Sequence, residues 1–514
     1  MTTAGAWNIA EADPGRTAVV AADGETRSYQ ALTTRSNQLA HGLAELGLKR
    51  GDRVAVAMHN TPAMLEITLA AMQSGLYVVP INYHGTAEDI AYIIEDSAAK
   101  AFFTDPELAA VCAAALDKLN FPRDVRFSSA ATPGFVDLAS WQRQAVERAA
   151  LTPAGSVMVY TSGTTGRPKG VLRPLPAHDA DVEAERQVWL LKLFGVETGP
   201  GVHLVNSPLY HTAVMNLTLS ALHAGQTLIL MGDWDAEAAL QLIERHRVTS
   251  THMVATHFHR LLALPDAVKA RYDTSSLSHV IHGAVPTPVS IKQRMLDWWG
   301  PVIYEYYGSS EVGGTMVTPE EWLTRPGTVG KPFEITRLEI LDDDGRPVAA
   351  GQAGWIYMQQ GDDEFRYHND AQKTAGAREG KLICVGDIGY VDEQGYLFLC
   401  GRDAEIIISG GVNIYSAAVE ACLLEHPAVR DVAVIGAPDE EFGEQVKAVV
   451  VPAAGQAPGE PLAAELMRHC RDGLAPINCP RSVDFVTGLP RDPSGKLYKQ
   501  RVRETYWQGR DRAL

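Results

Sequence analysis

The chain has 514 residues, of which 46% are hydrophobic, so it is long enough for two or more domains with a large core. Its 45 lysines and arginines against 62 aspartates and glutamates give a formal charge of −17. This balance argues against a sequence-independent nucleic-acid binder, which needs a basic face. It leaves room for a local basic site that binds the phosphates of a nucleotide or of CoA.

The chain begins without the charged and apolar segments of a signal peptide, and no apolar run approaches the length of a membrane-spanning helix. Its six cysteines are scattered without a CxxC pair, which is typical of free thiols in a reducing compartment. We therefore expect a cytoplasmic protein with no integral membrane segment and no nucleic-acid partner. Peripheral contact with a membrane through exposed apolar surface stays open.

Short apolar strands alternate with amphipathic helices over residues 17–160. Asp23-Gly24 predicts a hairpin turn. The alternation implies a parallel, doubly wound sheet, in which ligands bind beyond the carboxyl ends of the strands. Residues 122–150 have weak periodicity and are expected to connect this region to the next. The expected strands are 17–20, 54–56, 75–80 and 101–103, and the expected helices are 29–46, 64–72 and 89–95.

Residues 160–170, Tyr-Thr-Ser-Gly-Thr-Thr-Gly-Arg-Pro-Lys-Gly, follow an apolar run at 157–159 that predicts a buried strand. Glycines let backbone N–H groups approach phosphate oxygens, hydroxyls add donors and the lysine adds a positive charge. This is not a Walker A loop, because Pro168 precedes the lysine and Gly170 follows it. The stretch predicts a polyphosphate cradle, and the alternative is a surface turn rich in glycine and threonine. The predicted phosphate-binding residues are Thr161, Ser162, Gly163, Thr164, Thr165, Gly166 and Lys169.

This stretch resembles the phosphate-binding motif of the adenylate-forming superfamily, which includes acyl-CoA synthetases, luciferases and the adenylation domains of peptide synthetases. Four further motifs follow in the family's order and spacing, so the resemblance spans essentially the whole chain. It implies an α/β protein with a large N-terminal domain of doubly wound sheets, residues 1–402. A small, mobile α+β domain, residues 403–514, would follow. The implied cofactors are ATP, Mg²⁺ and CoA.

Histidines mark the expected acyl site. After a helix expected at 179–193, residues 206–211 match the family's Pro-x-x-His element, whose histidine, here His211, borders the acyl site and helps to orient the carboxylate. The alternative for His211 is a purely structural role. His252, His257 and His259 raise the question of a metal cluster, but two of them sit in an apolar stretch and metal sites need converging side chains. By resemblance, His257 lines the carboxylate pocket.

A strand expected at 280–286 runs into a turn of small residues. By resemblance, this turn, with Gly283 and Ala284, lets the adenine base lie flat against the backbone. The small residues after Glu311 and an apolar neighbourhood suggest room for a bulky hydrophobic acid. The glycines assigned to that substrate pocket are Gly308 and Gly313.

Residues 304–311 match the family element Tyr-Gly-x-Thr/Ser-Glu. The resemblance places Tyr307 near the adenine and lets Ser310 donate to the α-phosphate. It assigns Glu311 to Mg²⁺, together with Thr165, and a carboxylate oxygen suits that ion. The alternative is a helix that begins here, with Ser310 as its N-cap and Glu311 in its first turn.

Asp387 and Arg402 flank a predicted hairpin, whose turn is at 392–395. By resemblance, Asp387 holds both ribose hydroxyls, which suits the two oxygens of an ionised carboxylate. Arg402 would reach the phosphates. We place the domain boundary directly after Arg402.

The residues after Arg402 predict a small α+β domain. The expected strands are 406–408, 432–435 and 446–451, and the expected helices are 415–426 and 462–474. By resemblance, the turn with Gly410 and Gly411 approaches the pantetheine arm of CoA, where glycine leaves space for a thin chain. Lys496 ends a Pro/Ser/Gly loop and, by resemblance, bridges the carboxylate and the α-phosphate during adenylation.

The resemblance implies an AMP-forming acid–CoA ligase. A carboxylate attacks the α-phosphorus of MgATP, pyrophosphate leaves, and the CoA thiol then takes the acyl group from the adenylate. Charge neutralisation and positioning carry the first step, and the family performs the second after the small domain rotates. No anchor for an amino acid's ammonium group aligns, and fatty, alicyclic, polycyclic and aryl acids stay open. The predicted catalytic residues are His211, Ser310, Glu311 and Lys496.

The sequence departs from the family at two places. The pivot two residues after Arg402, usually Asp or Lys, is Ala404 here, and Asp403 precedes it. Either Asp403 serves as the pivot or the rotation is biased and the two half-reactions are unequal. Residues 171–174 also lack the histidine common there.

Other functions stay open. They are an acid–carrier-protein ligase, a specialist for one half-reaction, a luciferase-like oxygenase and a non-catalytic nucleotide-binding protein. The oligomeric state is open too, with a homodimer as one option.

Overall fold

The structure is a computed structural model that describes residues 4–141, 145–148, 152–161, 167–285, 287–361, 364–491 and 497–508. The chain forms two compact units. Unit 1 comprises Met1–Met253, Leu264–Ile281 and Asp362–Gly376. Unit 2 comprises Val254–Ala263, His282–Gly361 and Ala377–Leu514. Each unit therefore combines segments that are distant in the sequence.

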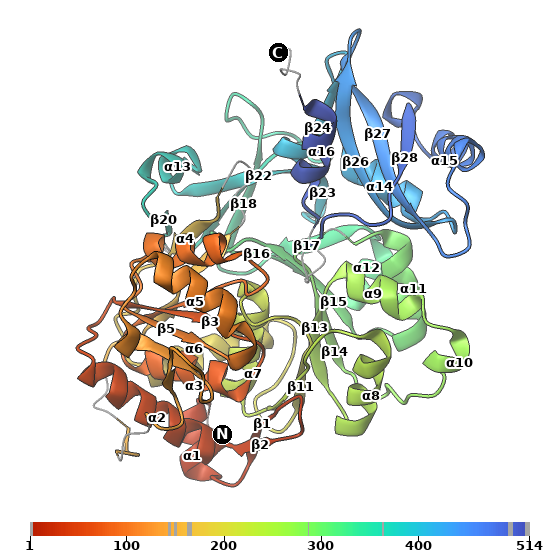
Figure 1. Ribbon diagram of the computed structural model, residues 1–514. Coiled ribbons are helices and arrows are strands. Elements are labelled where there is room, and N and C mark those ends of the chain that lie inside the picture. Colours follow the sequence, from red (N-terminus) through yellow and green to blue (C-terminus); the bar gives the residue numbers. More distant parts are fainter. Residues whose placement is uncertain are drawn as a thin grey trace. The chain divides into compact units, whose positions relative to one another are not determined.

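One sheet of unit 1 has the strand order β7-β6-β5-β3-β4-β8, and its paired neighbours are parallel. The helices α4 (Ala87–Ser97) and α5 (Ala109–Lys118) share a hydrophobic core with its central strands. They are drawn in orange in Figure 1. This arrangement confirms the predicted parallel sheet. The strands are β3 (Arg53–Ala57), β4 (Tyr77–Pro80), β5 (Ala101–Thr104), β6 (Arg126–Ser128), β7 (Val136–Asp137) and β8 (Ser156–Val157).

A second sheet of unit 1 has the order β14-β13-β11-β12-β1-β2. The Asp23-Gly24 hairpin is confirmed, because β1 and β2 pair antiparallel and Gly24 has a φ of 89°. The strands are β1 (Thr17–Val20), β2 (Thr26–Ser28), β11 (Val202–Val205), β12 (Thr227–Leu230), β13 (Ser250–Met253) and β14 (His279–His282). The helices around these strands in the sequence are α2 (Tyr29–Glu45), α3 (Pro62–Gln73), α6 (Ala180–Lys192), α7 (Thr212–Ala224) and α8 (Ala236–His246).

The single strand expected at 157–159 is wrong, because the chain changes sheets within this run. β8 ends at Val157 and pairs with β4, whereas β9 (Val159–Thr161) pairs antiparallel with β10 (Lys169–Leu172). The Met158 side chain between them is fully buried. An apolar run shows that a segment is buried, but it does not show which partner its backbone hydrogen-bonds to.

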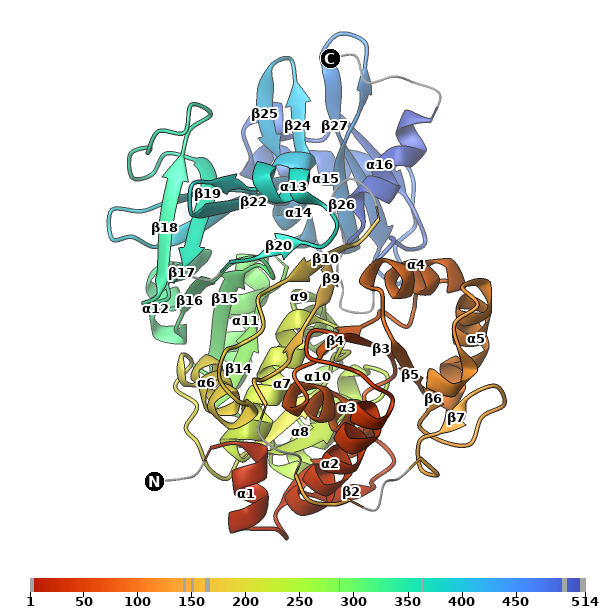
Figure 2. The ribbon, with the colours of Figure 1, turned by 90° about the vertical axis from the view of Figure 1, so that its left-hand side faces the viewer.

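In unit 2, antiparallel strands form the order β15-β16-β17-β23-β22-β19-β18. Figure 2 shows β18, β19 and β22 side by side. The strands are β15 (Ile303–Gly308), β16 (Gly314–Val317), β17 (Thr328–Pro332), β18 (Thr336–Leu341), β19 (Gly354–Gln360), β22 (Leu382–Val391) and β23 (Leu397–Arg402). The helices of this region include α9 (Ala255–Leu262), α11 (Val289–Trp299) and α12 (Pro319–Thr324).

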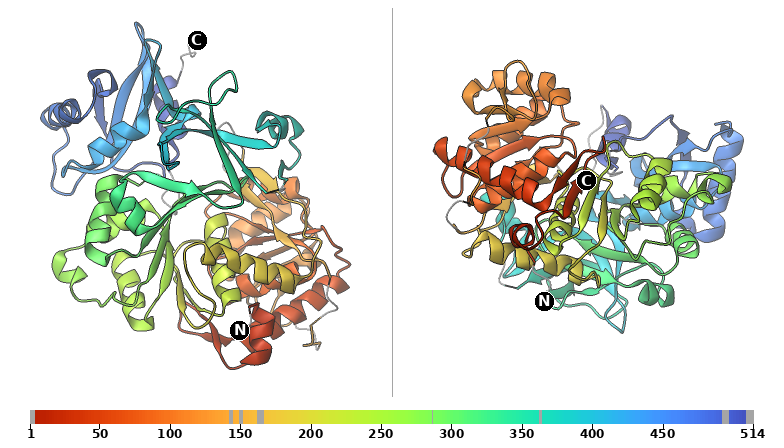
Figure 3. Two further views of the ribbon diagram at one scale, coloured as in Figure 1. Left: turned by 180° about the vertical axis from the view of Figure 1, so that it is seen from behind. Right: turned by 90° about the horizontal axis from the view of Figure 1, so that it is seen from below.

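The C-terminal part of unit 2, blue in Figures 1 and 3, has a core of its own. Along β26, Val432 and Val434 join the core that includes residues of α14 and α15, while Ala433 and Ile435 pack with Val502 of α16. This alternation places helices on both faces of the sheet. The elements are β24 (Ile406–Ser409), β25 (Val412–Tyr415), α14 (Ser416–Leu424), β26 (Val429–Asp439), β27 (Gly443–Pro452), α15 (Glu460–Gly473), β28 (Ser482–Phe485) and α16 (Lys499–Trp507).

Two predictions from the sequence concern membrane-spanning helices and disulfide bonds. No helix among the described residues combines the length and apolarity that crossing a bilayer requires. All six cysteines are free thiols, as their scattered spacing predicts.

Candidate active site

The predicted phosphate cradle is the hairpin of β9 and β10 in unit 1. Thr161, the last residue of β9, lies opposite Lys169, the first residue of β10. A Cβ atom on Gly170 would lie 2.5 Å from Cε of Met158, so any other residue there would require the Met158 side chain to shift. The predicted residues Ser162, Gly163, Thr164, Thr165 and Gly166 form the stretch between the strands and lie outside the described residues.

Lys169 pairs with a carboxylate that sequence reasoning did not single out. Its Nζ atom lies 2.6 Å from Oδ2 of Asp370, and this hydrogen bond raises the pKa of Lys169 and lowers that of Asp370. Asp370 also accepts the backbone N–H of Lys373. No motif marks Asp370, because 201 residues separate it from its partner. The lysine is therefore charged and held at the strand end by a counter-ion.

Further contacts attach the hairpin to α4. The Tyr160 hydroxyl donates to Asp96 over 2.7 Å, and the Tyr92 hydroxyl donates to the carbonyl of Pro168 over 3.0 Å. Burial, followed by the hydrogen bond to Asp96, raises the pKa of Tyr160 far above its usual range. Both ends of the described part of the hairpin are thus anchored to the same helix.

His211 is the N-cap residue of α7, directly after the loop that follows β11. Its ring lies 4.4 Å, centroid to centroid, from the ring of Tyr210, and Tyr210 packs edge-on against Tyr83 at 5.2 Å. The histidine therefore stands at the carboxyl end of a parallel strand, the place where sheets of this kind bind ligands.

His257 and His259 both lie on α9 of unit 2, and His257 is 2% exposed. Two residues apart on a helix, their side chains point to different sides.

In unit 2, Tyr307, Asp387 and Arg402 form one hydrogen-bonded cluster. Asp387 and Arg402 lie opposite each other on β22 and β23. Oδ2 of Asp387 accepts the Tyr307 hydroxyl over 2.6 Å, and Oδ1 accepts Nε of Arg402 over 2.7 Å. Burial and then the charge of Asp387 raise the pKa of Tyr307 well above its usual value, so its hydroxyl keeps its proton. Three residues that were predicted to bind the nucleotide are thus brought together by tertiary contacts.

The expected adenine turn follows β14. A Cβ on Gly283 would lie 2.6 Å from the Tyr306 ring, so only glycine fits beside that ring. Ala284 has a φ of 68°, in the left-handed region that is unfavourable for residues with a side chain. A strained backbone of this kind is common at ligand sites.

The alternative of a helix starting at Ser310 is wrong. Residues 309–313 form a loop between β15 and β16. The Oγ atom of Ser309, not Ser310, accepts the backbone N–H groups of Glu311 and Val312, each over 3.2 Å. The carboxylate-bearing residue Glu311 is 9% exposed.

The small residues around this loop differ in what surrounds them. A Cβ on Gly313 would lie 2.6 Å from Oγ1 of Thr336 and 2.8 Å from Oε1 of Gln360, so protein atoms occupy that space. A Cβ on Gly308 would meet only backbone atoms at 3.4 Å or more. Packing alone accounts for the glycine at 313, whereas nothing in the packing demands one at 308.

In the C-terminal part, Gly410 and Gly411 form the β24–β25 turn with φ values of 57° and 80°. A Cβ on Gly410 would lie 2.9 Å from Phe442, while the space around Gly411 is open. The expected glycine turn is therefore present. Lys496 lies outside the described residues.

Comparison with known proteins identifies the family. The family model described as AMP-binding enzyme matches residues 7–361, and the one described as AMP-binding enzyme C-terminal domain matches residues 418–496. The chain belongs to this family. The predicted superfamily is thereby confirmed, and its two parts occur in the expected order.

Relatives of this AMP-binding enzyme cover nearly its whole length. Feruloyl-CoA synthase of Amycolatopsis sp is 33% identical over 98% of this chain and 99% of its own. The fatty acid–[acyl-carrier-protein] ligase ScoC of Streptomyces coeruleorubidus is 30% identical over 96% and 94%. The solved structure of the amide bond synthetase McbA from Marinactinospora thermotolerans is 29% identical, with a TM-score of 0.81 and coverage of 96% and 97%. The predicted fold class, a large α/β part followed by a smaller C-terminal part, is confirmed.

One buried cluster of this AMP-binding enzyme was missed by sequence reasoning. Nζ of Lys292 on α11 lies 2.7 Å from Oε2 of Glu305 on β15, and Nε2 of His282 lies 3.4 Å from the same oxygen. Lys292 and His282 are fully buried and Glu305 nearly so. His282 directly precedes Gly283, and Glu305 directly precedes Tyr306, so the cluster lies one residue behind the expected adenine turn.

Proposed function

We propose that this protein activates a hydrophobic carboxylic acid as an acyl-adenylate and passes the acyl group to the thiol of CoA. The enzyme class itself, an ATP-dependent acid–thiol ligase that uses ATP, Mg²⁺ and CoA, is confirmed by the family and by the relatives. The residue roles and the nature of the acid are our proposal. The observation that carries it is the cluster of Tyr307, Asp387 and Arg402.

Asp387 is proposed to hold the ribose of ATP. Asp387 is 5% exposed, and each oxygen of its carboxylate accepts one hydrogen bond from the protein. The carboxylate is therefore held in one orientation, and its remaining lone pairs keep fixed directions. Burial lowers the pKa of Arg402, but the combined attraction of Asp387 and Glu405 outweighs burial and raises this pKa, which keeps the guanidinium charged for a phosphate group. Tyr307 is proposed to face the adenine base, and the base would lie flat against the backbone of Gly283 and Ala284.

Glu311 and Thr165 are proposed to hold Mg²⁺, which would neutralise charge on the triphosphate. Glu311 fits this role, because it carries a carboxylate on a short loop. That loop is held in place by hydrogen bonds from the backbone N–H groups of Glu311 and Val312 to Oγ of Ser309. Carboxylate oxygen is the ligand type that Mg²⁺ prefers in proteins. Ser310, in the same loop, is proposed to donate to the α-phosphate.

The charges of Lys169 and Lys496 are proposed to offset the negative charge that ATP and the acid bring together. Neutralisation and in-line positioning are the main contributions a protein can make to such a displacement. His211 and His257 are proposed to border the acid, with the backbone at Gly308 beside it. The turn of Gly410 and Gly411 is proposed to admit the pantetheine arm of CoA.

We infer a domain boundary directly after Arg402, with the C-terminal part moving between the two half-reactions. The separate core of the elements from β24 onward supports this inference, since a part with its own core can move as a unit. A cytoplasmic location is supported by six free thiols.

The test is acid-dependent exchange of labelled pyrophosphate into ATP in the absence of CoA. We expect exchange with one of three classes of acid, fatty, aryl or polycyclic, and thioester formation once CoA is added. Folded wild-type protein that supports no exchange with any class, yet converts a synthetic acyl-adenylate and CoA into thioester, would contradict the proposal and leave the one-half-reaction specialist.

A second candidate differs only in the acceptor. The relatives are named for three reactions: formation of a CoA thioester, transfer to an acyl carrier protein and formation of an amide bond. Incubating the preformed acyl-adenylate with CoA, with a phosphopantetheinylated carrier protein or with an amine separates the three. Faster transfer to the carrier protein than to CoA would favour the carrier-protein ligase.

A further inference from the structure

The first residue of α16, Lys499, is the centre of a buried ionic network in the C-terminal part. Its Nζ atom lies 2.8 Å from Oε2 of Glu405, 2.9 Å from Oε2 of Glu420 and 2.9 Å from Oγ of Ser416. These three contacts use all three N–H donors of the ammonium group. The side chains of Lys499 and Glu420 are 13% and 16% exposed, whereas that of Glu405 is 33% exposed.

The partners of Lys499 come from two separate segments. Glu405 ends the short 3-10 turn Asp403–Glu405, which directly follows Arg402 at the end of β23. Ser416 and Glu420 lie four residues apart on α14 and therefore share one face of that helix. Oε1 of Glu420 also accepts the backbone N–H of Val434 on β26 over 2.8 Å. Lys499 thus joins α16, the turn after Arg402 and α14.

Charge makes this network sensitive to the loss of its cation. Burial alone would lower the pKa of Lys499, but attraction to Glu420 and Glu405 outweighs it and raises the pKa. The ammonium group is therefore charged, and it separates two carboxylates that would otherwise repel each other. Removing one partner of a buried ionic network leaves uncompensated charge and is therefore strongly destabilising.

The same region holds the base of the loop that ends in Lys496. Arg491 and Leu497 form an antiparallel bridge, and the backbone N–H of Tyr498 donates to the carbonyl of Pro490 over 2.8 Å. Arg491 is in turn held by Asp431 of β26 through two hydrogen bonds of 2.6 and 2.8 Å. The two ends of the loop are therefore joined, and each is fixed by an ion pair.

The two ion pairs lead to different places. Arg491 ties the loop base to β26. Lys499 ties it to Glu405, one residue after Ala404, the position where the family usually has Asp or Lys.

We propose that Lys499 is a positioning residue for the adenylation step: by binding Glu405 and Glu420 it fixes the base of the Lys496 loop to the turn after Arg402. The proposal rests on the proposed function, in which Lys496 acts in adenylation and not in thioester formation. Loosening this attachment displaces Lys496 without removing it. A misplacement of about 1 Å can cost on the order of a hundredfold in rate.

The test compares Lys499→Met with Lys447→Met. Lys447 is a matched control, because its side chain is also 13% exposed and pairs with a carboxylate, Asp484, at 2.9 Å. Among the described residues, that pair joins β27 to β28 and contacts Tyr506, which lies on α16 seven residues after Lys499. Both half-reactions are measured separately: acid-dependent pyrophosphate exchange, and thioester formation from a synthetic acyl-adenylate and CoA.

For Lys499→Met we expect exchange to fall at least about tenfold while thioester formation stays within about threefold. Lys447→Met should change the two rates equally and by less than about threefold. Lys499→Arg, which keeps the charge and adds donors, should recover most of the exchange. Equal losses in both half-reactions for Lys499→Met, or the same split for Lys447→Met, would overturn the proposal.

If Lys499→Met does not fold, Glu405→Gln carries the test. Its side chain is 33% exposed, and the variant leaves the pair of Lys499 with Glu420 intact. We expect a loss of about threefold in exchange alone, and unchanged exchange contradicts the proposal. Wild-type protein is measured in parallel, because absence of exchange in the wild type speaks against the proposed function and not against the role of Lys499.

Discussion

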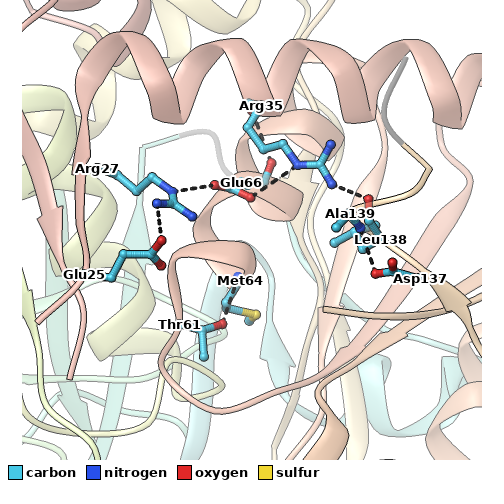
Figure 4. A network of polar contacts seen from close by, with 10 residues as sticks. Glu25, Arg27, Arg35, Thr61, Met64, Glu66, Asp137, Leu138 and Ala139 are labelled. Carbon is cyan, nitrogen blue, oxygen red and sulfur yellow. Dashed lines mark hydrogen bonds and ion pairs between the residues drawn. The ribbon is translucent and has the colours of Figure 1, made fainter. Parts of the chain in front are cut away.

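Glu66 in unit 1 and Glu305 in unit 2 are buried to almost the same degree, but they have different partners. The side chain of Glu66 on α3 is 7% exposed and that of Glu305 on β15 is 8% exposed. Figure 4 shows Arg27 and Arg35 on either side of Glu66, with Nε atoms 3.9 and 3.8 Å from its carboxylate, which is beyond hydrogen-bond length. Glu305 instead has Nζ of Lys292 at 2.7 Å.

The difference lies in how well the burial of charge is compensated. Burial raises the pKa of Glu66 to about 7, and the two arginines offset only part of this shift. Burial also acts on the direct pair, raising the pKa of Glu305 and lowering that of Lys292, but each charge opposes the other's shift at close range. Glu66 is therefore expected to titrate in the folded protein near neutral pH, and the Lys292–Glu305 pair to behave as one unit.

Breaking the direct pair should have the largest effect. Lys292→Met leaves Glu305 buried without its cation, and we expect the free energy of unfolding to fall by about 3–5 kcal/mol. The double variant Lys292→Met/Glu305→Gln removes both charges and should recover more than half of that loss. Denaturant unfolding measures all three proteins. If the single and double variants are equally unstable, the loss of stability comes from altered packing and not from the uncompensated charge.

Removing the titrating carboxylate should change how stability depends on pH. The folded pKa of Glu66, about 7, exceeds its ordinary value of 4.5, so between these pH values the folded protein holds a proton that the unfolded chain releases. Its contribution to stability is therefore complete below pH 4.5 and is lost as pH rises through 7.

Glu66→Gln should accordingly flatten the fall in unfolding free energy between pH 5 and 8 by up to about 3 kcal/mol. Glu25→Gln is the matched control, because Glu25 also pairs with Arg27 but its side chain is 50% exposed. The same pH slope in wild type and Glu66→Gln would show that the arginines keep Glu66 ionised despite its burial.

Asp387 combines a direct ion pair with a binding role, so its loss should affect ligand binding more than folding. We expect Asp387→Asn to raise KM for ATP about tenfold, since the amide cannot replace an ionised acceptor. Asp392→Asn, in the hairpin turn between the same two strands, serves as the control and should leave KM unchanged. An unchanged KM for Asp387→Asn removes Asp387 from the ATP site.

The smallest effect is expected where the pair is partly exposed. The side chains of Lys169 and Asp370 are 32% and 23% exposed, so Asp370→Asn should leave the unfolding free energy nearly unchanged. The variant releases Lys169 from its counter-ion, and we expect KM for ATP to fall about two- to threefold. A raised KM would mean that Asp370 orients Lys169 instead of competing with phosphate for it.

Local sequence was sufficient wherever structure depends on neighbouring residues. The helix over Tyr29–Glu45, the Asp23-Gly24 turn and the glycine turn at 410–411 were all predicted. Periodicity and turn chemistry act over a few residues, so a single chain reveals them. The motifs were equally local, which is why the family could be recognised from them.

Pairing between distant segments could not be predicted in this way. The sequence by itself determined the parallel α/β architecture, the superfamily and the residue types of the candidate site. Only the tertiary structure decided that the run at 157–159 divides between two sheets, that Asp370 pairs with Lys169, and that Lys499 binds Glu405. The reason is physical: a charged side chain in the sequence shows that a partner is needed, but the partner is chosen by whichever segment folding brings within about 3 Å.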